Sequence, residues 1–154
     1  MIDDEVLRFI QRSVLCWLAT VDDDGHPNVT PKEIFIAHDA RTLLIANIAS
    51  PNSQANILAR PKVCVSFVDV FAQKGCKLKG RAEVIRADDA RFQPLSQKLR
   101  EMAGTRFPFA SLFKIEVQSA EPIIAPSYRL YPETTEADQI RAAMRTYGVR
   151  PRTD

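Results

Sequence analysis

The sequence lacks any apolar run near the roughly 20 residues that a membrane-spanning helix needs. It also lacks an excess of charge of either sign, because 21 Lys and Arg stand against 19 Asp and Glu, a net charge of +2. A nearly balanced charge gives no electrostatic argument for a nucleic-acid or membrane partner. The first residues, Met1-Ile-Asp-Asp-Glu, are acidic, whereas a secretory signal begins with a basic segment. We therefore expect a cytoplasmic protein without either partner.

Cysteine and histidine are scarce as well. The three cysteines, Cys16, Cys64 and Cys76, lie far apart in strand-like stretches, and the chain has two histidines. No Cys-x-x-Cys pair or histidine cluster accompanies them, so we expect no zinc site and no other metal site. We interpret the cysteines as small apolar side chains in a reducing compartment.

What remains is the composition of an ordinary folded protein, 45% hydrophobic and 26% charged over 154 residues. Short runs rich in Val, Ile, Leu and Phe, separated by turn residues, predict six strands. These are residues 15–21, 28–37, 42–48, 62–70, 76–86 and 110–119.

Four helices are expected between and after these strands, at 3–14, 52–60, 88–102 and 135–147. Asp3 or Asp4 caps the first, Gly104 stops the third, and Thr135 with Asp138 forms a capping box for the fourth. Residues 120–134 are proline-rich and read as loop. This pattern predicts a mainly β (α+β) fold, a six-stranded antiparallel split β-barrel with peripheral helices, because closure removes exposed strand edges. An open antiparallel sandwich is the alternative. We expect one domain over 1–154, with its core at about 5–120, a loop and helix at 121–148 and a tail at 149–154.

Pro31 and Lys32 stand in the middle of a predicted half-buried strand, after the turn at Asp24-Gly25. Strict alternation along 28–37 places Lys32 on the same face as Ile34 and Ile36, where an unpaired ammonium is costly. Either Lys32 extends to water or pairs with an acidic neighbour, or an anionic ligand lies across the strand. Pro31 removes a ladder donor and so marks an edge or an irregularity.

Two further segments can be interpreted in the same two ways, as ordinary structure or as part of an anion-binding site. Ala49-Ser-Pro-Asn-Ser-Gln-Ala-Asn56 opens a helix directly after a strand, and a helix N-terminus with added hydroxyls binds phosphate well. The plain alternative is that Ser50 or Asn52 only caps this helix. Lys77 and Lys79 share one strand face, which is either exposed to solvent or directed at an anion.

Five segments in this order resemble one family. They are Leu18-Ala-Thr-Val21, Asp24-Gly-x-Pro-Asn-Val-Thr-Pro-Lys32, Ala46-Asn-Ile-Ala-Ser50, Asn56-Ile-Leu-Ala-Arg-Pro61 and Lys79-Gly-Arg-Ala-Glu83. Together they resemble the pyridoxamine 5′-phosphate oxidase-related FMN-binding split barrels, especially the small bacterial members, over about residues 5–120.

The resemblance implies a homodimer with FMN in clefts at the subunit interface. Thr30, Pro31 and Lys32 would follow the flavin ring and ribityl chain, with Ala46, Asn47 and Ile48 beneath the ring. Ser50, Ser53 and Asn56 would reach the phosphate or ribityl end, and Lys79 would close the phosphate site. Loops 70–76 and 104–110 of the partner, with Phe71, Phe107 and Phe109, would cover the ring.

The resemblance implies an FMN-dependent oxidoreductase of the flavin-reductase kind. The alternatives are a non-catalytic FMN-binding module for electron transfer, or a same-fold protein that binds heme or a deazaflavin. No catalytic residue is assigned, because His26 and His38 lie in turns. The segment Tyr128-Arg-Leu-Tyr-Pro132 has no tryptophan beside it, unlike the substrate segment of the true oxidases, so pyridoxamine phosphate oxidation is not expected.

Overall fold

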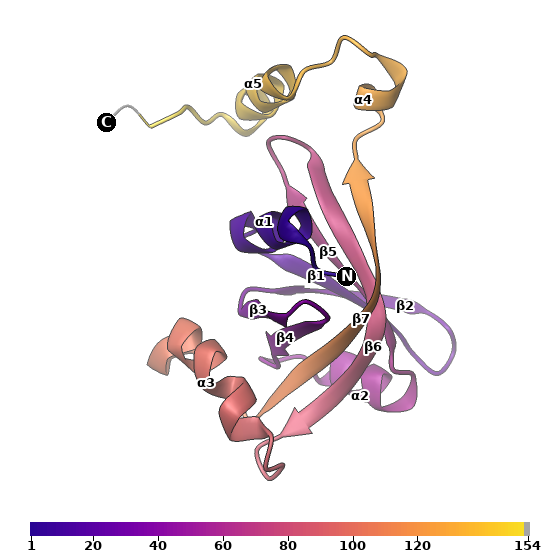
Figure 1. Cartoon of the computed structure of the whole chain (residues 1–154), viewed down its shortest axis with the longest axis vertical. Coiled ribbons are helices and arrows are strands. Elements are labelled where there is room, and N and C mark those ends of the chain that lie inside the picture. Colours follow the sequence, from indigo (N-terminus) through magenta and orange to yellow (C-terminus); the bar gives the residue numbers. More distant parts are fainter. Residues whose placement is uncertain (153–154) are drawn as a thin grey trace.

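The computed structural model describes residues 1–152 and arranges them as one antiparallel sheet with helices on both of its faces (Figure 1). Neighbouring strands pair in the order β2-β1-β5-β6-β7-β4-β3. The seven strands are β1 (Cys16–Val21), β2 (Pro27–Lys32), β3 (Phe35–Asp39), β4 (Thr42–Ala46), β5 (Lys62–Asp69), β6 (Lys74–Arg86) and β7 (Ser111–Ile124). The fold is therefore α+β, as expected. Within residues 1–152 the two edge strands β2 and β3 do not pair with each other, so the sheet is not a closed barrel.

The prediction of six strands was wrong because one expected strand is two. Residues 28–37 were expected to run straight, but the chain bends at Glu33 and Ile34 between β2 and β3. The carbonyl of Ile34 there accepts a hydrogen bond from the Ala46 amide at 2.9 Å. A bend shifts the alternation of side chains, so the expected common face of Lys32, Ile34 and Ile36 was also wrong. Lys32 is cross-strand from the core residue Cys16, whereas Ile34 and Ile36 pack in a different cluster.

The two faces of the sheet carry separate apolar clusters. The larger cluster includes Leu18, Phe67 and Phe113, and we name its side of the sheet the inner face. The smaller cluster includes Leu44, Phe92 and Leu112 and lies on the outer face. All five residues of β4 are buried, because this strand is covered on both sides.

The four predicted helices are present with ends within about four residues of the predicted positions, and a short fifth helix, α4, was not predicted. They are α1 (Asp4–Arg12), α2 (Pro51–Ala59), α3 (Phe92–Ala103), α4 (Ser127–Leu130) and α5 (Glu136–Tyr147). The side chain of Asp3 accepts the Val6 amide at 2.9 Å, which confirms the first cap. Thr135 accepts the Asp138 amide at 3.2 Å, as the capping box predicts. Gly104 ends α3 with φ of +59°, a conformation that favours glycine.

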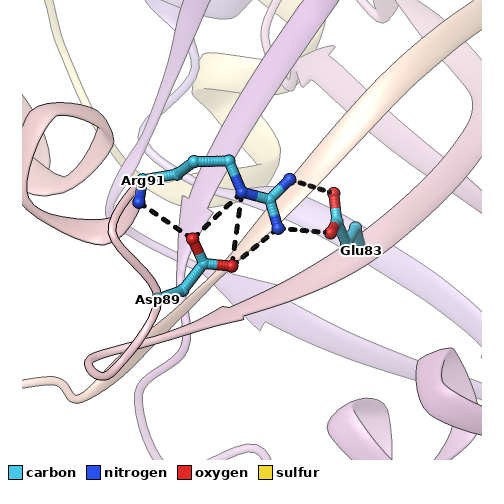
Figure 2. Close-up of polar contacts among 3 residues, drawn as sticks. All are labelled: Glu83, Asp89 and Arg91. Atoms are coloured by element: carbon cyan, nitrogen blue, oxygen red, sulfur yellow. Dashed lines mark hydrogen bonds and ion pairs between the residues drawn. The ribbon is translucent and has the colours of Figure 1, made fainter.

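Two helices cover the inner face and one covers part of the outer face. On the inner face α1 buries Val6 and Ile10, and α2 packs against β1, β2 and β6. On the outer face α3 buries Phe92 and Leu99 against β4 and β7. Just before α3, the Arg91 guanidinium bridges two carboxylates, Glu83 on β6 at 2.6 Å and Asp89 at 2.6 Å (Figure 2). This bridge fastens the start of α3 to the sheet.

The chain after β7 forms an arm at the end of the molecule opposite α2 and α3 (Figure 1). The expected loop at 120–134 was wrong in part, because β7 continues to Ile124 and α4 follows. Three contacts hold the arm to the β5–β6 turn. The Tyr128 hydroxyl donates to the Ala72 carbonyl at 2.7 Å, Lys74 and Glu136 form an ion pair at 3.0 Å, and Phe71 packs edge-on against Tyr147. Phe71 therefore packs against a residue of its own chain.

Candidate functional site

Lys32 at the end of β2 is buried, with 5% of its surface exposed. Its ammonium contacts the hydroxyl of Ser50, the residue that precedes α2. Within the described part of the chain, no ion pair links Lys32 to a carboxylate. A buried positive charge without a counter-charge is costly, so this position calls for an explanation.

Burial shifts the pKa of both Lys32 and its cross-strand neighbour Cys16. Desolvation lowers the pKa of Lys32 from its ordinary value, and the smaller influence of the neighbouring Cys16 acts in the opposite direction. Burial raises the pKa of Cys16 to about 12, so the thiol is neutral at physiological pH. Cys16 therefore supplies no negative charge to Lys32.

The N-terminus of α2 adds to the positive character of this place. Ser50 occupies the cap position, but its side chain makes no capping bond; it donates instead to the Ile48 carbonyl at 3.0 Å. The first amides of the helix are therefore not satisfied by this cap, and they bring a partial positive charge. Ala49, just before, has φ of +48°, a strained conformation for a residue with a side chain, which tightens the turn into α2.

A buried polar cluster lies between α2 and the inner face of β1 and β2. The Thr20 hydroxyl accepts from both Asn28 at 3.2 Å and Asn56 at 3.0 Å. Ser53 is fully buried and shares a hydrogen bond with Thr30 at 3.1 Å. The structure thus brings Thr30, Ser53 and Asn56 together on the same side of the sheet as Lys32. Thr20 was missed, because a threonine inside an apolar strand gives no signal in the sequence.

Asn47 belongs to a second polar group, at the end of β4. Its amide donates to Gln54 on α2 at 2.7 Å and to Ser111 on β7 at 2.9 Å. The amide oxygen of Asn47 is buried without a partner among the residues described. Gln54 and Ser111 were also missed, and only the three-dimensional fold brings them together.

A cleft of about 240 Å³ opens beside Lys32. The residues that line it are Leu15, Pro31, Lys32, Glu33, Ile34, Ala46, Ile48 and Phe107. The combination of apolar walls with one ammonium suits a flat apolar group that carries a negative charge. Phe109, by contrast, packs edge-on against Phe92 in the outer-face cluster.

Lys79 lies on the other side of the sheet. Lys32 shares a cross-strand row with Cys16, Phe67 and Cys76, all buried on the inner face. Lys79 is three residues after Cys76 on β6 and therefore points to the outer face. There it forms an ion pair with Glu121 at 2.6 Å, and this contact raises the pKa of Lys79. Within one chain, the structure does not bring Lys79 to the other predicted residues.

Comparisons with known proteins give one family match and several similar solved structures. A family model described as pyridoxamine 5′-phosphate oxidase matches residues 2–127. A tagged HupZ protein of Group A Streptococcus is 26% identical over 78% of this chain and 92% of its own, with a TM-score of 0.67. An FMN-binding protein of Syntrophomonas wolfei is 14% identical over 79% of this chain and 86% of its own, with a TM-score of 0.66.

A third solved structure is HutZ, the heme storage protein of Vibrio cholerae. It is 18% identical over 80% of this chain and 94% of its own, with a TM-score of 0.60. At such identities the last two likenesses concern the fold alone. The search of curated proteins found no match. Over residues 1–152, no helix combines the length and the apolar character needed to cross a bilayer.

Proposed function

Because the chain belongs to the pyridoxamine 5′-phosphate oxidase family, we propose that it is an FMN-binding flavoprotein. We propose further that it is an FMN-dependent oxidoreductase of the flavin-reductase kind, which moves electrons or hydride to or from a small molecule. The observation that carries this proposal is the ammonium of Lys32, buried beside the start of α2 without a carboxylate. A bound phosphate dianion would supply the missing counter-charge.

The residues around Lys32 fit such a cofactor chemically. The ammonium of Lys32, the Ser50 hydroxyl and the first amides of α2 are donors of the kind that bind a phosphate monoester. The apolar cleft walls suit a flat aromatic ring. The proposed cofactor-binding residues are Thr30, Pro31, Lys32, Ala46, Asn47, Ile48, Ser50, Ser53 and Asn56, together with Lys79 of a second copy.

The role of the protein residues is to bind and orient. FMN, when bound, supplies the hydride and electron chemistry. Glu33 is the one carboxylate among the described residues that line the Lys32 cleft, and its side chain is exposed to water. No residue is assigned as a general acid or base, and this fits a flavin reductase, which needs little more than an open face above the ring.

We also propose that the protein is a homodimer, a split barrel with one flavin at each side of the subunit interface. The outer face supports this arrangement because it is apolar and uncovered beside β2. Trp17 is 43% exposed there and Val29 is 55% exposed. Large apolar side chains grouped on an open sheet face are typical of protein interfaces. A cytoplasmic location stays a prediction from the cysteine usage.

Heme is the second candidate ligand, and the observation that favours it is the fold neighbour named as a heme storage protein. A heme needs an axial ligand, usually histidine. The two histidines of the chain, His26 and His38, are exposed and neither lines the Lys32 cleft. The geometry therefore favours FMN over heme, and a deazaflavin would use the same flat cleft.

The absorption spectrum of the freshly purified protein tests the cofactor, because oxidised flavin, deazaflavin and heme absorb differently. We expect a flavin spectrum, or quenching of FMN fluorescence when FMN is titrated into the apoprotein. A Soret band, or no response to FMN, would contradict the proposal. Oxidation of NAD(P)H by the FMN-loaded protein then separates an oxidoreductase from a non-catalytic electron-transfer module.

A further inference from the structure

Three polar side chains on one face of the edge strand β2 all contact α2 or the residue before it. They are Asn28, Thr30 and Lys32, which alternate along β2 and so share a face. Asn28 donates to Ser53 at 3.4 Å, and Thr30 shares a hydrogen bond with Ser53 at 3.1 Å. Lys32 contacts Ser50. Thr30 therefore lies between Lys32, the proposed charge partner of the phosphate, and Asn28, an amide that the proposed function does not use.

Burial fixes the direction of the hydrogen bond between Ser53 and Thr30. A hydroxyl has one proton to donate, whereas an amide nitrogen only donates, so Ser53 is the acceptor toward Asn28. Ser53 is fully buried, and among the residues described Thr30 is the one acceptor in contact with it. A buried hydroxyl needs a partner for its proton, so Ser53 donates to Thr30. Thr30 is half-buried on an edge strand, and its own proton is left for a ligand or for water.

Thr20 on β1 holds the amide of Asn28 in this orientation. The two residues are cross-strand partners. The Thr20 hydroxyl accepts one N–H of Asn28 at 3.2 Å, which leaves the second N–H for Ser53. The same hydroxyl accepts from Asn56 at 3.0 Å and so is tied to α2 as well. Thr20 is 1% exposed, so it acts on a ligand only through these neighbours.

A phosphate dianion accepts hydrogen bonds and donates none, so it is sensitive to the direction of this chain of hydrogen bonds. A ribityl hydroxyl both donates and accepts, so it is less sensitive. We propose that Thr20 and Asn28 are positioning residues that present the Thr30 hydroxyl as a donor to the FMN phosphate beside Lys32. A donor that already points the right way needs no reordering when the ligand binds. This inference rests on the proposed function.

Titrations with FMN and with riboflavin, which lacks the phosphate, test the inference. Thr20→Val keeps the shape of the side chain and removes the hydroxyl, and Asn28→Leu removes the amide. Each should weaken FMN binding by roughly three- to tenfold and leave the Kd of riboflavin within about twofold of the parent value. Thr20→Ser keeps the hydroxyl and should retain parental FMN affinity.

A double-mutant cycle tests whether Thr20 acts through Thr30. Thr30→Val removes the hydroxyl that is proposed to contact the phosphate, so it should itself weaken FMN binding. In the Thr30→Val background, Thr20→Val should weaken FMN binding further by less than about twofold. Additive losses in this cycle would overturn the inference.

Thr42→Val is the matched control, because Thr42 is another buried strand threonine, at the start of β4, and does not line the Lys32 cleft. It should leave the Kd of both flavins within about twofold. Thermal melting checks that each variant is folded, and the half-buried position of Asn28 provides the same test if Thr20→Val does not fold. Equal losses for FMN and riboflavin would show a purely structural role and overturn the inference. A parent protein that binds neither flavin would refute the proposed function, and the inference with it.

Discussion

Replacement of Lys32 by methionine should change ligand binding and stability in opposite directions. Methionine keeps the length and apolar stem of lysine and removes the charge. In the apoprotein, Lys32 is 5% exposed and its ammonium contacts a neutral hydroxyl, so the charge is desolvated without compensation. Removing it should therefore stabilise the empty protein, while FMN loses a charged partner.

The expected sizes follow from these contacts. Loss of a charge-assisted hydrogen bond should weaken FMN binding by about 1.5–3 kcal/mol, or roughly 10- to 150-fold in Kd. Relief of a buried polar group that is poorly satisfied should raise the free energy of unfolding of the apoprotein by about 1–3 kcal/mol. For a chain of this size each kcal/mol corresponds to about 2–4 °C in Tm.

The sign of the pH dependence provides a further check. The pKa of Lys32 is lowered in the folded protein, so the buried positive charge reduces the free energy of unfolding by its full amount at low pH. This destabilisation disappears as the pH rises toward 10.5, the ordinary lysine value. The difference in stability between Lys32→Met and the parent should therefore shrink as the pH rises from neutral toward that value. Chemical denaturation at several pH values measures this difference.

Fluorescence titration with FMN measures the change in Kd, and thermal melting of the apoprotein measures the change in stability. Lys98→Met, at an exposed lysine on α3, is the control and should change neither quantity. An unchanged Kd for Lys32→Met would remove this lysine from the binding site. A lower Tm for the apoprotein would mean that the ammonium is satisfied without a ligand, and the physical argument for a bound anion would be lost.

Three further predictions concern binding, assembly and the sheet. A bound dianion should raise the pKa of Lys32, so FMN affinity should fall as the pH rises through the lowered pKa of the apoprotein, and titrations over that range should show no such fall for Lys32→Met. Trp17→Glu places a charge on the outer face, and light scattering should show a shift toward monomer with about tenfold weaker FMN binding. Gly80→Ala should destabilise the protein by about 1–3 kcal/mol in denaturant unfolding, because the new Cβ would lie 2.2 Å from the Glu116 carbonyl oxygen; an unchanged midpoint would show that the strands can separate there.

Local signals in the sequence predicted the elements well where a single residue decides the local geometry. Asp3 and Thr135 cap their helices, and Gly104 ends α3. The bend after Lys32 has no such marker, since Glu33 and Ile34 are ordinary residues for a strand. The bend arises because the chain leaves one edge of the sheet and joins the other, where Ile34 bonds to Ala46. This is a tertiary constraint, and a period-two pattern cannot reveal it.

The same limit explains why the candidate site was only partly predictable. Ser53 and Asn56 both lie on α2 and are near each other in sequence. Their hydrogen-bond partners Asn28 and Thr20 lie on the strands β2 and β1, so only the fold brings these residues together. Lys79 shows the opposite case, because sequence order placed it with the phosphate site while alternation along β6 turns it outward. The family pattern assigns Lys79 to the phosphate site, but the sheet of its own chain separates Lys79 from that site. In the proposed homodimer, a second copy would bring Lys79 to the site. The outward direction of Lys79 therefore ties its predicted role at the FMN phosphate to the proposed homodimer, because within one chain Lys79 pairs with Glu121 and not with the residues around Lys32.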